Sequence, residues 1–120
     1  MSAQQQYLHV SSITSPYGGY SQRVVPPEDA ELTHTGPGTP CGEFMRKYWL
    51  PVCLSDELAD LPKSIRILGE DLVAFRDGNG DVGVLHKHCS HRGTSLEYGI
   101  VTDRGVRCCY HGWLIHRDGT

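Results

Sequence analysis

The sequence predicts a small all-β fold, an antiparallel β-sandwich or barrel, with two metal-binding loops at one end. From residue 64 onward, short apolar runs alternate with turns rich in glycine and aspartate, a spacing typical of small sandwiches and barrels. Two similar loops, each with a cysteine and a histidine, follow such runs. The residues before position 64 predict a flexible N-terminal arm, a short helix, one edge strand and a single turn before the β-rich part.

The N-terminal part divides into an arm and the start of one domain. Residues 1–31 are polar, rich in Ser, Gln, Gly and Pro, and lack a hydrophobic period, so they predict a flexible arm. Residues 32–120 are then a single small domain. It begins with a short helix over Glu43–Tyr48. An edge strand is expected over Trp49–Leu54, because Pro51 within that run cannot donate a ladder hydrogen bond.

The β-rich part is expected to follow a turn or one helical turn over Ser55–Leu58, which Ser55 caps and which places Leu58 inward. Glycine-containing turns then separate the strands, since glycine adopts positive φ without strain. The expected strands are Ile65–Leu68, Leu72–Arg76 and Val82–Leu85, then a hairpin over Val101–Arg107 and a run over Trp113–Ile115.

Two short loops supply four candidate metal ligands. The first reads Cys89-x-His91 and the second Cys108-x-x-His111, and a glycine follows each histidine directly or after one residue. Two thiolates and two imidazoles suit a single tetrahedral zinc. They equally suit a two-iron, two-sulfur cluster with both cysteines on one iron and both histidines on the other.

The order of the ligands favours the cluster over zinc. Zinc fingers usually pair like with like, two cysteines and then two histidines. Here each loop carries one of each, so two facing loops place both sulfurs on one side and both imidazoles on the other. Leu96 and Trp113 are expected either to cover the sulfur side or simply to pack in the core, and the imidazoles are expected to face outward.

The other cysteines, and the histidine beside the first loop, are not expected to bind metal. Cys53 is expected to be a buried apolar side chain in the edge strand, and Cys41 an inert thiol at the start of the helix. Cys109 is adjacent to a ligand but points the other way on an extended backbone. His88 is expected to face solvent.

The two ligand motifs resemble a known family. Cys89-Ser90-His91-Arg92-Gly93, together with Cys108-Cys109-Tyr110-His111-Gly112-Trp113, resembles the Rieske domain of aromatic ring-hydroxylating oxygenases. The blocks Leu32–Pro40, Glu43–Val52 and Leu68–Arg76 resemble the N-terminus of phthalate-dioxygenase-type α subunits, so the likeness covers about residues 32–120. The sequence departs from the family at Cys109, where proline is usual.

The resemblance implies a Rieske [2Fe–2S] cluster held by Cys89, His91, Cys108 and His111, and one-electron transfer as the chemistry of this chain. It implies a reductase or ferredoxin as electron donor and a mononuclear non-haem iron domain as acceptor. It also implies a homotrimer, in which His111 passes the electron to a neighbouring subunit. The complete family member is an oxidoreductase, a dioxygenase or monooxygenase that hydroxylates or demethylates an aromatic compound.

The sequence ends shortly after His111, before any second metal site. We therefore expect an oxygenase fragment, truncated at its C-terminus, that has no catalytic residues of its own and serves only electron transfer. A stand-alone Rieske-type ferredoxin is the alternative, and a structural zinc module is the third possibility. The oxygenase-like blocks upstream favour the fragment, because a ferredoxin usually begins close to its first strand.

The composition excludes several classes of partner. With 11 basic and 14 acidic side chains the formal net charge is −3, so no nucleic-acid surface is expected. Residues 1–10 lack the basic start and apolar run of a signal peptide, and no run of about eighteen apolar residues could span a membrane. Five cysteines without a secretory signal indicate metal ligation and a cytoplasmic location.

Overall fold

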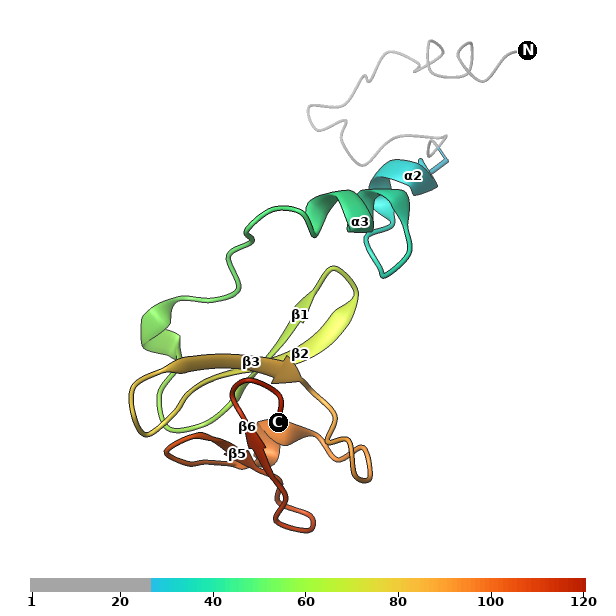
Figure 1. Cartoon of the computed structure of the whole chain (residues 1–120). Coiled ribbons are helices and arrows are strands. Elements are labelled where there is room, and N and C mark those ends of the chain that lie inside the picture. Colours follow the sequence, from blue (N-terminus) through green and yellow to red (C-terminus); the bar gives the residue numbers. More distant parts are fainter. Residues whose placement is uncertain (1–26) are drawn as a thin grey trace, which may run out of the picture.

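The computed structural model describes residues 27–120, so most of the predicted arm lies outside the described residues. Within this range, two short α-helices, α2 (Ala30–Thr33) and α3 (Pro40–Met45), precede six β-strands (Figure 1). The strands form two antiparallel three-stranded sheets, which confirms the predicted small all-β fold. Helix α2 begins inside the predicted arm, where the carboxylate of its N-cap Asp29 accepts a hydrogen bond from the backbone N–H of Glu31.

The first sheet consists of β1 (Lys63–Ile67), β2 (Glu70–Arg76) and β3 (Val82–His86), with β2 in the centre. The three strands follow one another along the chain. The turn between β1 and β2 lies at Leu68 and Gly69, earlier than the predicted turn over residues 69–71, and the turn between β2 and β3 lies where it was predicted. In the middle of β2, Val73 and Phe75 are fully buried, because their side chains point out of the sheet into the apolar core.

The second sheet consists of β4 (Ile100–Val101), β5 (Gly105–Arg107) and β6 (Leu114–His116), with β5 in the centre. Strands β4 and β5 form the predicted hairpin. A Cβ atom on Gly105 would lie 2.0 Å from the carbonyl oxygen of Ile115, so only glycine allows β5 and β6 to approach this closely.

One apolar core combines side chains of both sheets. In Figure 1, β5 and β6 lie below β3. The core joins aliphatic and aromatic side chains of both sheets to the two cysteines of the predicted metal loops. Its buried members are Val73, Phe75, Leu85, Cys89, Leu96, Val106 and Cys108. The two loops therefore start from the buried core.

The predicted edge strand over Trp49–Leu54 is wrong. The segment is irregular, Trp49 is fully exposed, and Cys53 is half-buried and lies outside the core. Within residues 27–120, neither sheet includes this segment, so its backbone has no ladder partner. Pro51 removes one donor as well, and apolar side chains alone do not make a strand.

The predicted helix over Glu43–Tyr48 is displaced toward the N-terminus, to Pro40–Met45. The hydroxyl of Thr39 accepts a hydrogen bond from the N–H of Gly42 at 3.2 Å and caps the helix. Pro40 occupies the first helical position, where its missing N–H costs no hydrogen bond. The capping residue thus determines where the helix begins.

The predicted helical turn is a 3₁₀-helix over Ser55–Glu57, and it does turn Leu58 into the protein. Ser55 opens this helix and does not cap it: its hydroxyl accepts a hydrogen bond from the Arg76 guanidinium at 2.6 Å. The carboxylate of Glu57 instead accepts from the backbone N–H of Leu54 at 2.8 Å. No helix within residues 27–120 has the length and apolar character needed to cross a bilayer.

Candidate metal centre

The first predicted loop is a compact turn closed by its own backbone. It leaves β3 and returns into the 3₁₀-helix Leu96–Tyr98. The N–H of Cys89 donates to the carbonyl of Thr94 at 2.9 Å, and the N–H of Gly93 donates to the carbonyl of Cys89 at 2.8 Å. These two hydrogen bonds close the loop directly behind its cysteine.

The second loop connects β5 and β6 and repeats this pattern. The N–H of Cys108 donates to the carbonyl of Trp113 at 2.8 Å, and the N–H of Gly112 donates to the carbonyl of Cys108 at 3.0 Å. Gly93 and Gly112 have φ values of +74° and +76°, which glycine adopts without strain. The two loops are thus the same backbone turn, made twice.

The two thiols are buried. Cys89 and Cys108 are each 4% exposed and belong to the same core cluster, in which Leu96 is 2% exposed. Leu96 therefore packs in the same core as the two thiols. Neither cysteine forms a disulfide, so both sulfurs are available as ligands.

The two imidazoles lie together on the outer side of the loops. His91 is half-buried and His111 is exposed, and their ring centroids are 4.7 Å apart in an edge-on arrangement. The expectation that Trp113 covers the sulfur side is wrong. Its indole is 51% exposed and stacks on the ring of His91, with centroids 4.5 Å apart and planes 9° from parallel.

These four residues fit a [2Fe–2S] cluster better than a single ion. The buried thiols form one pair and the outer imidazoles form another, which is the division that Cys₂/His₂ ligation of two irons requires. Within residues 27–120, no three His, Cys, Asp or Glu side chains gather around one ion position. A two-iron cluster that is bound by two cysteines on one iron and two histidines on the other does not need three protein ligands around a single position.

The neighbouring thiols lie apart from this arrangement. Cys109 is exposed, which agrees with a side chain that points away from its buried neighbour Cys108, and Cys41 is half-buried. His88 is exposed as expected, but its Nδ1 lies 3.0 Å from the carbonyl oxygen of Gly93. No pattern in the sequence indicates this contact.

An ion pair stands beside the first loop. Lys87 and Glu97 are 3.3 Å apart and both are largely covered. Burial alone would raise the pKa of Glu97. The hydroxyl of Ser95, 3.0 Å away, and the Lys87 ammonium outweigh burial, and the pKa lies below its ordinary value. The carboxylate therefore stays charged at neutral pH and ties the two sides of the loop together.

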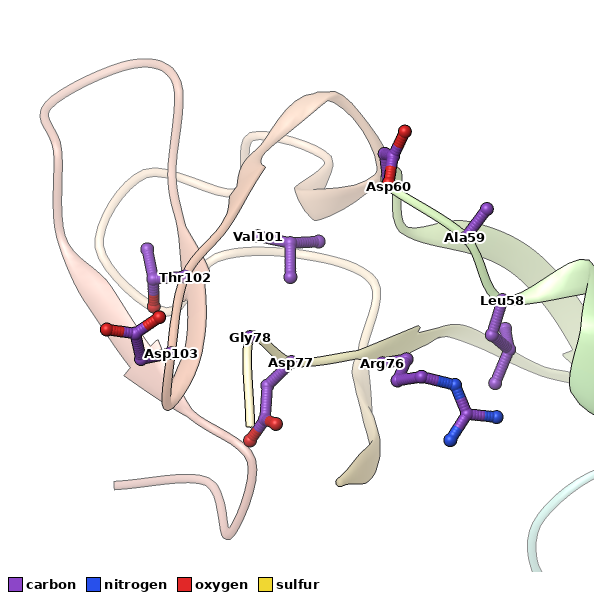
Figure 2. A pocket seen from close by; sticks show the side chains of 9 residues that line it. All are labelled: Leu58, Ala59, Asp60, Arg76, Asp77, Gly78, Val101, Thr102 and Asp103. Carbon is purple, nitrogen blue, oxygen red and sulfur yellow. The ribbon is translucent and has the colours of Figure 1, made fainter. Parts of the chain in front are cut away.

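A cleft of about 430 Å³ lies elsewhere, between the segment that follows the 3₁₀-helix, the end of β2 and the β4–β5 turn (Figure 2). Its lining residues are Leu58, Ala59, Asp60, Arg76, Asp77, Gly78, Val101, Thr102 and Asp103. None of the four candidate ligands is among them, so the cleft is separate from the candidate metal centre.

The chain is similar to known proteins. Residues 48–120 match the Rieske [2Fe–2S] domain family. The oxygenase subunit of a tert-butanol monooxygenase / tert-amyl alcohol desaturase from Aquincola tertiaricarbonis is 64% identical over 107 residues, 87% of this chain. The phenoxybenzoate dioxygenase α subunit of Ectopseudomonas oleovorans is 53% identical over 103 residues, 86% of this chain. The chain spans only 23% and 25% of the lengths of these two relatives.

A solved structure agrees with the sequence matches. Dicamba monooxygenase superposes with a TM-score of 0.57 at 32% identity, over 61% of this chain and 23% of that one. The matched family, the two sheets and the paired loops all point to the same assignment. The chain belongs to the Rieske [2Fe–2S] domain family.

Proposed function

We propose that this chain transfers single electrons through a Rieske [2Fe–2S] cluster, with Cys89 and Cys108 on one iron and His91 and His111 on the other. The observation that carries the proposal is the opposite burial of the two ligand pairs on two matching loops. When bound, such a cluster takes up and releases one electron at a potential of about −150 to +300 mV. The thiols in the core hold the buried side rigid, and the imidazoles form the face that a partner can reach.

The exposed imidazole of His111 is the better route for the electron to leave the domain. Its ring is exposed, whereas the ring of His91 is half-covered and lies under the indole of Trp113. A partner that docks on this face can therefore approach His111 more closely. We assign His111 to the electron acceptor for that reason.

The chain is further proposed to be the N-terminal, electron-transfer part of an oxygenase subunit, and not a ferredoxin. The relatives match over 86–87% of this chain, and so upstream of residue 48, where the Rieske match begins. A reductase or ferredoxin would supply electrons, and a mononuclear iron domain in a neighbouring subunit of a homotrimer would accept them. The five free thiols suit a cytoplasmic location.

The substrate is proposed from two relatives that differ in chemistry. One is named for phenoxybenzoate, an aromatic acid, and the other for tertiary alcohols. An aromatic compound is the first candidate. A small tertiary alcohol is the second, because the relative named for it is 64% identical. Identity in an electron-transfer domain reflects ancestry and not the shape of a substrate pocket, so both need testing on the full-length subunit.

The experiment that tests the electron-transfer proposal counts iron and acid-labile sulfide in the purified chain and records a low-temperature EPR spectrum after reduction with dithionite. Two irons, two sulfides and a rhombic signal of low average g are expected. Cys108→Ser should abolish the signal, whereas Cys109→Ser, at the exposed neighbouring thiol, should keep it. A colourless protein with one zinc per chain would refute the proposal.

A further inference from the structure

Each metal-binding loop is held by a side chain that is not a ligand. The residue directly before the first cysteine, His88, places its Nδ1 3.0 Å from the carbonyl oxygen of Gly93. The residue directly before the second cysteine, Arg107, donates from Nη1 to the carbonyl oxygen of Gly112 at 2.9 Å. Two chemically different side chains thus make the same contact at equivalent places.

The equivalence extends to the bases of the loops. His88 forms a β-bridge with Ser95, and Arg107 pairs with Leu114 between β5 and β6. Both residues are exposed, so neither owes its position to core packing. A carbonyl oxygen only accepts hydrogen bonds, so Nδ1 of His88 carries the proton.

The acceptor in each loop is the glycine that turns the chain back. The N–H groups of Gly93 and Gly112 already donate to the carbonyls of Cys89 and Cys108. With the glycine carbonyl also bonded, each turn is held on both sides of its left-handed residue. Each glycine lies one or two positions after the loop histidine, so holding it limits the directions in which that imidazole can point.

We propose that His88 and Arg107 are a matched pair of positioning residues, which hold the two loops in the geometry that presents the histidine ligands. This inference rests on the ligand set proposed above. It assigns a role to two exposed residues that are not proposed metal ligands and do not belong to the core cluster. Partners of metal ligands outside the coordination sphere typically change metal affinity about 10- to 100-fold when removed.

The test compares variants of the holoprotein that delete or keep the donor. His88→Leu and Arg107→Met delete it, whereas His88→Asn and Arg107→Lys keep an N–H at similar reach. We expect the deleting variants to shift or broaden the EPR g values and to release iron to a chelator about tenfold faster. The donor-keeping variants should restore the wild-type spectrum and release rate.

Two matched controls are available in the same sheets. His86 at the end of β3 and Arg104 in the β4–β5 turn are exposed, and their side chains make no hydrogen bond within residues 27–120. His86→Leu and Arg104→Met should leave spectrum and release rate unchanged.

The outcomes separate this inference from the proposed function. Wild-type g values and release rates in His88→Leu and Arg107→Met would overturn the positioning role. If the deleting and the donor-keeping variants changed the g values and the iron-release rate equally, the positioning role would also be overturned. The hydrogen bond would then not be the cause of the change. A wild-type protein without iron and sulfide would instead refute the cluster itself. Should His88→Leu not fold, the comparison of Arg107→Met with Arg107→Lys still decides the question, because it contrasts loss and retention of the equivalent donor.

Discussion

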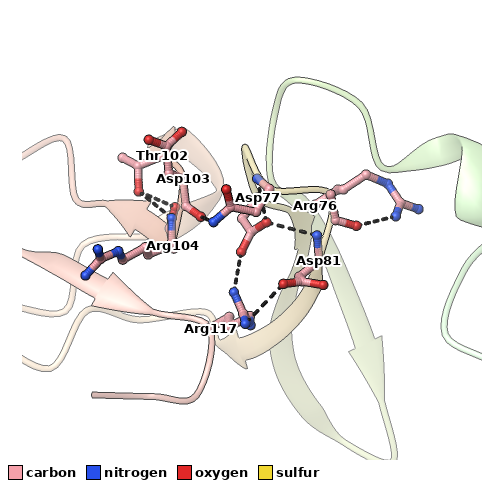
Figure 3. A network of polar contacts seen from close by, with 10 residues as sticks. Arg76, Asp77, Asp81, Thr102, Asp103, Arg104 and Arg117 are labelled. Carbon is pink, nitrogen blue, oxygen red and sulfur yellow. Dashed lines mark hydrogen bonds and ion pairs between the residues drawn. The ribbon is translucent and has the colours of Figure 1, made fainter.

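The guanidinium of Arg117 lies 2.8 Å from the carboxylate of Asp77, although forty positions separate the two residues in the chain. Asp77 belongs to the β2–β3 turn and its side chain is fully buried, while Arg117 directly follows β6. The same guanidinium also reaches Asp81 at 3.1 Å (Figure 3). The pair therefore fastens the first sheet to the second at a point away from the metal loops.

Removing the charge of Asp77 should weaken the contact between the two sheets and lower the stability of the protein. Asp77→Asn keeps the side-chain oxygen that accepts hydrogen bonds from the backbone N–H groups of Asn79 and Asp81. It removes the negative charge that pairs with Arg117. We expect the melting temperature to fall by about 5 °C, within the usual range for losing one such contact in a domain of this size. Calorimetry checks this, with Asp56→Asn, at an exposed site, as the control. An unchanged melting temperature would show that the pair contributes nothing.

The same pair makes stability depend on acid pH. Burial alone would raise the pKa of Asp77, but hydrogen bonds from the N–H groups of Asp81 and Asn79 and from Arg117 outweigh burial and hold the pKa below its ordinary value. A depressed folded-state pKa stabilises the protein above the unfolded value of about 4 and loses that contribution as pH falls through the folded value. The difference in melting temperature between wild type and Asp77→Asn should therefore be constant above about pH 5 and shrink below pH 4. A difference that grows toward low pH would contradict this assignment.

Arg46 connects the N-terminal helices to the first sheet. Its guanidinium donates to the carbonyls of Thr35 at 3.2 Å and Leu68 at 3.0 Å, and pairs with Glu70 at 2.9 Å. Arg46→Met removes all of these contacts, whereas Glu70→Gln removes only the charge of one partner. We expect hydrogen exchange of the α3 amides to become about tenfold faster in Arg46→Met and to change less in Glu70→Gln, because charge-assisted hydrogen bonds contribute about 1.5–3 kcal/mol. Equal exchange rates in Arg46→Met and wild type would mean that α3 is held by other contacts.

The features that follow from local chemistry were predictable from the sequence. Glycine and aspartate mark several of the turns that join the strands, and the spacing of two cysteines and two histidines indicates a candidate metal centre. Trp49–Leu54 misled the prediction, because a strand needs a partner that the local pattern does not reveal. The stacking of Trp113 on His91 and the ion pair of Asp77 with Arg117 depend on how distant segments meet. No spacing rule within the chain encodes such contacts.

The two tryptophans allow a direct test of the cover over His91. Trp113 stacks on that imidazole, whereas Trp49 is fully exposed. Trp113→Ala should open the outer face to water and oxygen, so the cluster absorbance should bleach several-fold faster in air. Trp113→Phe should be intermediate, because a smaller ring still covers part of the imidazole. Trp49→Ala is the matched control and should bleach at the wild-type rate, while equal rates in all four proteins would show that the indole does not shield the site.

Removing the metal should destabilise the whole domain and not the loops alone. Cys89 and Cys108 share the core cluster with Phe75, Leu96 and Val106, so the proposed ligands are also packing residues that join the two sheets. Without metal, that part of the core holds two unlinked thiols. A domain this small buries a limited apolar area, and bound metal commonly supplies part of its folding free energy. We therefore expect apoprotein to melt at lower temperature and over a broader range than holoprotein, measured by circular dichroism at equal concentration. Coincident transitions would mean that the core between the sheets is stable without the cluster, and that the cysteines contribute to it as apolar side chains only.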